Sequence, residues 1–470
     1  MIDSLRNVFA IPDLRKRLLF TFGLLAVYRL GCHIPTPGID PARLLEFMQS
    51  QAGSLLGFVN TFTGGSLGRI AIFALGIMPY ITASIILQLL QVVWPYLEKL
   101  SKEGEMGRRK ITQYTRYGTV VISAFQSIGI ALFLQGARTP STNLPLVPEP
   151  GIGFVLMTIL TLTTGCAFVM WLGEQISERG IGNGISLIIF GGIVVGLIPA
   201  IINTTQRVLS GELNPIFIVL LCVFMVFVVA FIVFMERSQR RIPVQYAKRV
   251  VGRKMYGGQS TYLPLRVNTG GVIPVIFASS ILMLPVTGAQ MIGQRWPSLA
   301  WLSRGFEYIS YASPWYYLLY IAAIVFFSYF YVSIIYNPSD VAENMRKYGG
   351  FIPGIRPGKR TAEHIDRILS RITLIGALYL SAVSVLPDVL LSGVKLRFIP
   401  FVGDSIDAFL VGNGLEWITT GSGISFYFGG TSLLIVVGVA MDFVQQVESQ
   451  LVMRNYEGFM KRGRIKGRRG

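Results

Sequence analysis

Cysteine, histidine and serine, the side chains most often used for metal binding and nucleophilic catalysis, are few or poorly placed in this sequence. The chain has 3 cysteines and 2 histidines, and it contains no CxxC or HExxH spacing. Ser84 and Ser279 lie in apolar segments that hold no histidine, although a serine nucleophile needs such a base within reach. No pair of aspartates occurs in these segments either. The sequence therefore predicts no catalytic residue, no metal site and no cofactor, which excludes an enzyme.

Glycines in the motif RGIGNGI resemble a phosphate-binding loop. Gly180, Gly182 and Gly184 follow an apolar segment of helical length. Phosphate-binding loops of this kind follow a β-strand. The motif therefore predicts a tight turn on the cytoplasmic side.

Composition indicates a polytopic membrane protein. Hydrophobic residues make up 52% of the chain, mean hydropathy is +0.56, and charged residues make up 14%, against about 25% in soluble domains. Long apolar runs predict transmembrane helices, and the first of them, behind Arg15-Lys16-Arg17, is read as an uncleaved helix. The ten predicted spans are Leu18–Ile34, Ile70–Trp94, Tyr117–Leu134, Ile152–Leu172, Ile185–Ile202, Pro215–Phe234, Gly270–Leu284, Trp315–Tyr336, Ile372–Leu391 and Phe426–Phe443.

The distribution of basic residues predicts the orientation of these spans. An even number of spans puts both termini on one side. If that side is the cytoplasm, 33 of the 42 Lys and Arg residues fall in cytoplasmic segments. Because cytoplasmic loops carry an excess of Lys and Arg, both termini are expected in the cytoplasm.

Two helix breaks occupy matching places in the two five-span halves. The second span of the first half carries Gly76-Ile77-Met78-Pro79, and the second span of the second half carries Gly271-Val272-Ile273-Pro274. Paired Gly/Pro interruptions indicate a central site in an inverted-repeat membrane fold. A broken helix in a membrane also needs protein or a water-filled cavity around it. The alternative is chance, because Gly and Pro are common in membrane helices.

Isoleucines, rather than charges, lie near these breaks. Ionisable residues such as Arg29, Glu174 and Asp388 fall near the ends of spans, whereas a coupled transporter needs them near the midplane. An apolar constriction can gate by dewetting. The alternative is that the isoleucines face lipid or other helices. Separately, Gly192 and Gly196 form a GxxxG motif, which predicts close helix packing. The candidates for the constriction are Ile77, Ile81, Ile185, Ile189 and Ile276.

Two predicted cytoplasmic loops, 235–269 and 337–371, exceed 30 residues and are too long to be minimal connections. Arginines with aromatic and proline neighbours suit docking to phosphates or to an acidic protein. Positive-inside bias explains the charge but not the length. The docking candidates in these loops are Arg240, Arg241, Arg253, Lys254 and Arg356.

Several long motifs resemble the bacterial SecY family, the main subunit of the Sec protein translocon. The similarity runs from about Arg15 to Tyr456. It is carried by GGSLGRIAIFALGIMPYITASIILQLL, KEGEMGRRKITQYTRYGT, MWLGEQISERGIGNGIS, QRRIPVQYAKR, QSTYLPLRVN, FIPGIRPG and YFGGTSLLIVV. The resemblance implies an all-α fold of ten helices, arranged as a clamshell of two inverted halves around an hourglass pore. It also implies that the pore opens across the membrane and sideways into lipid.

The resemblance assigns roles to individual residues. It implies a pore ring of Ile77, Ile81, Ile185, Ile189, Ile276 and Ile435. It implies a movable plug over Asn60 to Phe73, with Asn60, Phe62, Thr63, Gly64, Gly65 and Arg69 as its marked positions. The second and seventh spans match a lateral gate, flanked by the third and eighth, with Pro79, Pro274, Gln126 and Asn268 as gate positions. Arg253 and Arg356 match loop tips that meet the SecA motor and the ribosome.

Domain boundaries and partners complete the expectation. The chain is divided into a cytoplasmic segment 1–17, halves 18–202 and 203–443, and a basic tail 444–470. An outside loop, 392–425, is longer than the resemblance leads us to expect. The implied partners are SecE, SecG, SecA, the translating ribosome, unfolded preproteins with their signal sequences, and membrane lipid. The implied location is the bacterial cytoplasmic (inner) membrane.

Overall fold

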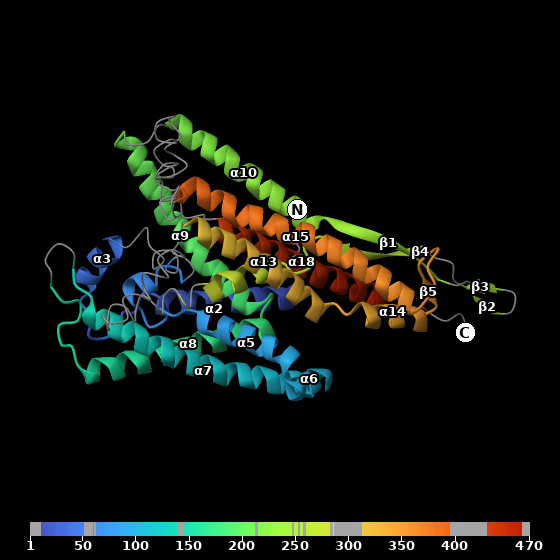
Figure 1. The fold of residues 1–470 in the computed structure, drawn as a ribbon, viewed down its shortest axis with the longest axis horizontal. Coiled ribbons are helices and arrows are strands. Elements are labelled where there is room, and N and C mark those ends of the chain that lie inside the picture. The colour runs from blue at the N-terminus through green and yellow to red at the C-terminus, as the bar shows by residue number, and fades with distance from the viewer. Residues whose placement is uncertain are drawn as a thin grey trace. The chain divides into compact units, whose positions relative to one another are not determined.

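Helices make up most of the two units into which the chain divides (Figure 1). A computed structural model describes residues 11–50, 60, 63–139, 144–211, 215–246, 249–251, 254–256, 260–282, 285, 313–394 and 430–462. Unit 1 comprises the described residues of Met1–Thr205, Met283–Glu307 and Val439–Gly470, and unit 2 comprises those of Gln206–Leu282 and Tyr308–Gly438. The outside loop, apart from residues 392–394, lies outside the described residues.

Unit 1 is a packed group of helices. They are α2 (Pro12–Gly31), α3 (Pro41–Ser50), the 3-10 turn η1 (Leu67–Arg69), α5 (Met78–Val93), α6 (Pro95–Lys102), α7 (Glu105–Gly136), α8 (Ile152–Arg179) and α9 (Gly184–Leu209), which extends four residues past the unit boundary. α7 packs along α8 and α5, and α2 packs on α8. Prolines in the first turn open α2, α5 and α6, where the missing N–H costs nothing.

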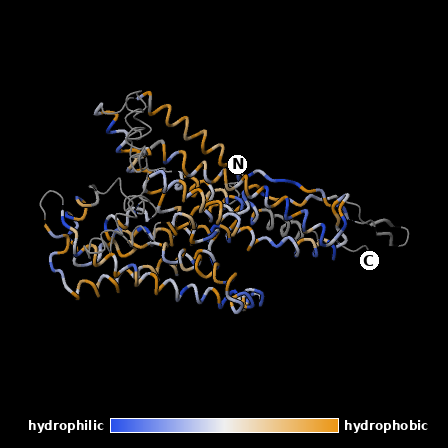
Figure 2. The backbone as a smooth tube through the Cα atoms, viewed as in Figure 1, coloured by the Kyte–Doolittle hydropathy of each residue, from blue (hydrophilic) through white to orange (hydrophobic). Residues whose placement is uncertain are grey.

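Unit 2 combines long helices with small sheets. It contains α10 (Pro215–Arg237), a short helix at Ile273–Leu282, α13 (Pro314–Ile335), α14 (Pro338–Lys347), α15 (Lys359–Ser392) and the start of α18 (Gly430–Arg462). Figure 2 shows an almost unbroken apolar α10. Ser313 caps α13 by accepting a hydrogen bond from the Tyr316 amide, and Asn337 caps α14 in the same way at Ser339, as N-cap residues commonly do.

Strands correct the expectation of an all-α chain. β1 (Gln239–Tyr246) pairs antiparallel with β4 (Ser260–Arg266) and with β5 (Gly350–Phe351), and β2 (Arg249–Val251) pairs with β3 (Lys254–Tyr256). The first sheet joins the two predicted docking loops. Its apolar face packs with helix residues into one core, formed by Ile242, Leu265, Ile352, Ile365 and Ile372.

Each of the ten predicted spans overlaps a described helix, but the ends differ. Seven described helices are long and apolar enough to cross a membrane, and the pair α5 and α6, bent by 100°, would make eight. α7 and α15 begin 12 and 13 residues before the predicted spans, because polar helical turns continue the apolar ones. α5 begins at Met78 rather than Ile70, and the seventh helix is confined to Ile273–Leu282.

The RGIGNGI motif forms the tight turn that the sequence predicts. Gly182 adopts a φ of +92°, which favours glycine. The Ile181 amide donates to Thr21 Oγ1 at 3.2 Å, and the Gly184 amide donates to Ser177 Oγ at 2.9 Å. The turn therefore binds α8 to α9 and both to α2.

Candidate channel site

The two predicted helix breaks have the same backbone form. Gly76 and Gly271 have φ values of +54° and +59°, and each stands two residues before the helix that follows, at Met78 and Ile273. Positive φ is accessible to glycine at little cost. A proline then occupies the second position of each helix, where its fixed φ suits the first turn. The matching sites are thus two helix starts of one backbone form rather than interruptions of a longer helix, because residues 70–77 and 267–272 are not helical.

All six isoleucines of the predicted ring lie in or next to the first two turns of helices. Ile77 and Ile81 open α5, Ile185 and Ile189 open α9, and each pair is four residues apart on one helix face. Ile276 and Ile435 occupy similar positions in the short helix and in α18.

The low exposure of four of the six isoleucines argues against their contact with lipid. The exposed fractions are 5% for Ile77, 7% for Ile81, 5% for Ile189 and 0% for Ile435. Ile185 and Ile276 are half-buried. Four of the residues belong to unit 1, and Ile276 and Ile435 belong to unit 2. Within unit 2, a Cβ built on Gly438 of α18 would lie 2.5 Å from Val272 Cγ2 at the second break.

The plug segment is defined here as residues 60–73, of which the structure describes Asn60 and Thr63–Phe73; Phe62 lies outside the described residues. It is a self-bonded turn. Asn60 accepts from the Gly65 amide through its carbonyl, at 2.9 Å, and from the Gly68 amide through Oδ1, at 2.6 Å. Ser66 Oγ lies 2.8 Å from the Thr63 carbonyl and 3.0 Å from the Phe73 carbonyl. Gly64 and Gly65 have φ values of +66° and +83°, so the turn depends on glycine.

Small residues on the surrounding helices let the plug segment approach their backbones. A Cβ built on Gly64 would lie 2.8 Å from Gly192 Cα, and one built on Gly165 would lie 2.0 Å from the Ile72 carbonyl oxygen. Gly192 was expected to pack against another helix, but here it packs against the plug segment. A Cβ on Gly76 would meet Thr63 Cγ2 at 3.4 Å. The plug segment therefore contacts both the residues just before α5 and the third turn of α9.

An aromatic stack closes the other end of the plug segment, and sequence reasoning missed it. Phe73 stacks between Tyr28 of α2, with ring centroids 6.0 Å apart, and Phe168 of α8, at 5.9 Å. Phe168 in turn stacks on Trp171 at 5.6 Å. Aromatic residues in apolar segments are too common to reveal such a long-range arrangement.

The predicted lateral-gate residues are held within their own units. Pro79 and Pro274 are buried in the first turns of their helices, and Gln126 is half-buried on α7. Asn268 is buried, and its Nδ2 donates to Glu236 Oε1 at 2.6 Å. This bond ties the segment before the second break to the last turn of α10.

The predicted docking residues lie on the strands and on a turn. Arg240 and Arg241 are exposed on β1, Arg356 is exposed in the turn between β5 and α15, and the backbone of Lys254 lies in β3. Arg253 lies outside the described residues. The Arg356 carbonyl accepts from Thr361 Oγ1 at 2.9 Å, which fixes the turn at the start of α15.

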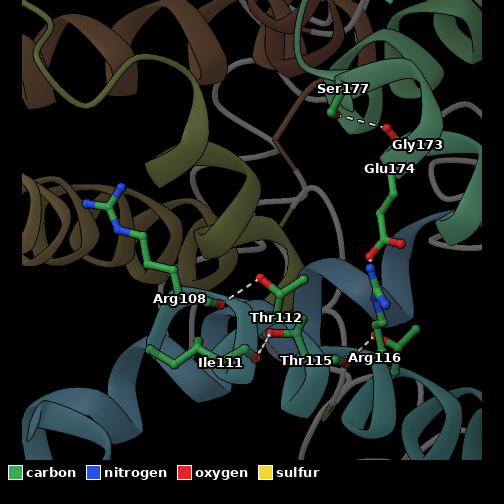
Figure 3. Close-up of polar contacts among 9 residues, drawn as sticks. Arg108, Ile111, Thr112, Thr115, Arg116, Gly173, Glu174 and Ser177 are labelled. Carbon is green, nitrogen blue, oxygen red and sulfur yellow. Dashed lines mark hydrogen bonds and ion pairs between the residues drawn. The ribbon is translucent and has the colours of Figure 1, made fainter. Parts of the chain in front are cut away.

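An ion pair joins α7 to α8. Figure 3 shows Arg116 and Glu174 pointing toward one another, with Arg116 Nε 2.8 Å from Glu174 Oε1 and side-chain exposures of 46% and 15%. Sequence reasoning placed Glu174 near the end of a span but gave it no partner, because 58 residues separate the two. Nearby, the hydroxyls of Thr112, Thr115 and Ser177 donate to carbonyls of their own helices, and Ser177 Oγ also accepts from the Gly184 amide.

We expect this pair to contribute more to stability than the exposed ion pairs of the same helix. Because Glu174 is mostly buried, a double-mutant cycle with Arg116→Gln and Glu174→Gln is expected to give about 1 kcal/mol of coupling, measured by thermal unfolding in detergent. The matched control is the Arg109–Glu105 pair, exposed by 75% and 81%, for which we expect less than about 0.5 kcal/mol. Equal coupling in the two cycles would contradict the role of burial.

Asp388 in unit 2 was placed near the end of a span by the sequence, but its burial and its partner were not predicted. Asp388, near the end of α15, accepts a hydrogen bond from the Gly430 amide at 2.9 Å. The next residue, Thr431, shares a hydrogen bond with Tyr320 of α13 at 3.1 Å. A carboxylate at a helix N-terminus satisfies a free amide and the helix dipole. Asp388 therefore holds the start of α18 against α15.

The structure has the fold of a protein-conducting channel. It resembles a SecY structure whose plug domain is described as stabilising the closed state of the translocation channel and maintaining a membrane seal, with a TM-score of 0.59 and 18% identity over 96% of this chain and 94% of that one. It also resembles Sec61 in the canine ribosome-channel complex from the endoplasmic reticulum, with a TM-score of 0.56 and 17% identity over 96% and 94%.

Sequence similarity then gives the family. The SecY family model matches residues 71–444. The protein translocase subunit SecY of Escherichia coli K12 is 48% identical over 461 residues, which cover 97% of this chain and 96% of the relative. The chain belongs to the SecY family. It is accordingly a channel subunit for protein translocation and not an enzyme, and a multi-pass protein of the bacterial cytoplasmic membrane.

Proposed function

We propose that the chain encloses the translocation pore within itself, and that the six isoleucines form the constriction. The observation that carries this proposal is the pair of matching helix starts after Gly76 and Gly271. Each places an isoleucine-bearing first turn directly after a left-handed glycine. A narrow apolar ring seals around any passing side chain without binding it, which sequence-tolerant passage requires.

The energetics of an unfolded chain favour such a pore. Lipid leaves peptide N–H and C=O groups unpaired, at several kcal/mol each, whereas a watered pore satisfies them. Segments of about 20 apolar residues gain about 0.3 to 0.6 kcal/mol per residue by leaving for lipid, and one central charge costs about 2.5 to 3.5 kcal/mol. A sideways exit therefore sorts transmembrane segments from secreted ones.

The lateral gate of this proposal consists of α5 and the helix Ile273–Leu282, flanked by α7 and α13. Pro79 and Pro274 lie in the first turns of these two helices. Each gate helix therefore begins after a non-helical segment and can move without bending a longer helix. Gln126 and Asn268 are the polar residues of this proposed gate. The Asn268–Glu236 hydrogen bond fixes the start of the seventh span to α10, which supports gate motion about this fixed end.

The plug segment closes the outer side of the pore in this proposal. Its contacts with Gly76 and Gly192, next to the helix starts that carry four of the isoleucines, support this role. The plug domain of the similar SecY structure, which stabilises the closed state of that channel, supports it as well.

The proposed topology has ten membrane helices in two inverted five-helix halves, 18–202 and 203–443, arranged as a clamshell. Both termini, 1–17 and 444–470, lie in the cytoplasm, and loop 392–425 lies outside. The placement of 33 of the 42 basic residues in the proposed cytoplasmic segments supports this orientation.

The proposed partners supply the energy and the substrate. The sequence has no Walker motif and no chain of midplane carboxylates, so SecA, the ribosome or the membrane potential must drive transport. SecE and SecG are proposed to complete a heterotrimer. The ribosome is supported by the canine complex and by the yeast Ssh1 complex bound to the 80S ribosome, since both contain channels of this fold.

A charge reversal at Arg356 tests the docking surface. We expect Arg356→Glu to reduce SecA-driven export about tenfold or more, because like charges across an interface cost several kcal/mol. Insertion of the chain itself into the membrane should be unchanged. Arg138→Glu, an exposed arginine on the predicted outer side, is the matched control. Normal export by the Arg356 variant would refute the docking assignment.

Reconstitution tests the proposed function as a whole. Vesicles containing the chain with SecE, SecG and SecA should give ATP-dependent protection of a signal-bearing preprotein from protease. Uptake of small solutes without such protection would instead favour a secondary transporter with inverted repeats.

A further inference from the structure

Arg29 is a charged residue in the last turn of α2, inside the first predicted span. Its Nη1 donates a hydrogen bond of 2.7 Å to the carbonyl oxygen of Gly64, 35 residues further along the chain. Among the residues that the structure describes, Arg29 forms no ion pair. An arginine inside a membrane segment is costly, and such residues usually have a functional role.

The Gly64 carbonyl is the part of the plug turn that needs an outside donor. The neighbouring Asn60 and Thr63 carbonyls accept hydrogen bonds from the Gly65 and Ser66 amides within the turn. The Gly64 carbonyl accepts from Arg29 instead. Because an unpaired carbonyl in a membrane is unfavourable, the arginine both stabilises the turn and determines where it rests.

The same turn of α2 also holds the far end of the plug segment. Tyr28 stacks on Phe73 with nearly parallel rings, 5° apart. A Cβ built on Gly31 would lie 1.9 Å from the Phe73 ring, so this glycine admits the ring against the helix. Tyr28, Arg29 and Gly31 therefore contact both ends of the plug segment from one helix turn.

We propose that Arg29 is the residue that retains the plug: its hydrogen bond to Gly64 sets how often the plug segment leaves its closed position. This inference rests on the proposed role of residues 60–73 as a plug. Outward movement of the segment breaks a charge-assisted hydrogen bond, whereas the aromatic stack is apolar and less directional. Arginine suits the role because its planar fork keeps a fixed geometry that the shorter-reaching ammonium of lysine lacks.

The expected effect follows from the strength of such a bond. Losing a hydrogen bond to a charged group corresponds to a change of about 10- to 150-fold in an equilibrium constant. We expect Arg29→Gln to raise the resting ion conductance of the reconstituted channel in planar bilayers by about that factor. Export of a reporter with a defective signal sequence should rise in parallel. Arg29→Lys should restore part of the closure.

Two controls separate retention from a general effect on folding. Arg17→Gln removes an exposed arginine of the same helix and should leave conductance unchanged. Arg29→Gln should also add no conductance in a variant lacking residues 60–73, because Arg29 would then have nothing to retain.

The results distinguish a failure of the role inferred for Arg29 from a failure of the proposed plug. If the deletion of 60–73 raises conductance and Arg29→Gln does not, the plug stands and the role of Arg29 is refuted. If the deletion leaves conductance unchanged, the plug assignment itself fails. If Arg29→Gln raises conductance equally with and without residues 60–73, the arginine acts on helix packing and the inference is overturned.

Discussion

Channels carrying Ile77→Asn or Ile276→Asn are expected to leak ions about 10- to 100-fold more than the unchanged channel. Removing a fully buried isoleucine side chain forfeits about 1.5 to 3 kcal/mol, and each 1.4 kcal/mol is a factor of ten in the frequency of wetting. Ile77 is buried and should show the larger effect, and the half-buried Ile276 should show the smaller one. Glycine at either position should act in the same direction. Planar-bilayer conductance measures the effect, and export of substrates with weakened signal sequences should become easier.

The control for this experiment is Ile198→Asn. Ile198 lies on α9, as Ile189 does, but it is 62% exposed, so an asparagine there should leave conductance unchanged. If Ile77→Asn and Ile276→Asn behave like the control, the ring assignment is wrong.

A single methyl group at Gly165 is expected to dislodge the plug segment. The added Cβ would lie 2.0 Å from the Ile72 carbonyl oxygen, a backbone atom that cannot rotate away. Overpacking of this kind costs about 1 to 3 kcal/mol, which raises the open fraction by about 5- to 150-fold. Gly165→Ala should therefore increase both resting conductance and the export of a reporter with a defective signal.

Gly153→Ala is the matched control for Gly165→Ala, since Gly153 lies on the same helix α8 and a Cβ there would meet no atom within 4 Å. Thermal unfolding in detergent should show a small loss of stability at most for the control. Tight closure in the Gly165→Ala channel would contradict the close packing of the plug segment.

Local signals in the sequence were enough to place a helix at each predicted span, but not the shorter helices α3, α6 and α14. Apolar runs revealed these helices, and Gly76 and Gly271 marked two helix starts that share one backbone form. Ends were less accurate, because α7 and α15 continue through polar turns that hydropathy alone excludes from a span.

Contacts between distant segments could not be read from one sequence. The Arg116–Glu174 pair, the Phe73 stack and the approach of Gly165 to Ile72 join residues whose types are common in membrane helices. The GxxxG motif at Gly192 predicted packing against a helix, and nothing local to it could show that Gly64 of the plug segment lies against it. The β1–β4–β5 sheet was missed because its two parts lie in separate loops.

That sheet has a mechanical consequence. β1 begins two residues after α10 ends at Arg237, and β4 ends at Arg266, seven residues before the helix at Ile273. The Asn268–Glu236 hydrogen bond links the connection between α10 and β1 to the connection between β4 and the helix Ile273–Leu282. A force applied to the β1–β4 hairpin therefore acts on the end of α10 and on the start of the helix Ile273–Leu282 together. Because β5 pairs with β1, the same hairpin is also connected to the start of α15. A motor or ribosome bound to these strands would therefore act on unit 2 at the ends of three helices.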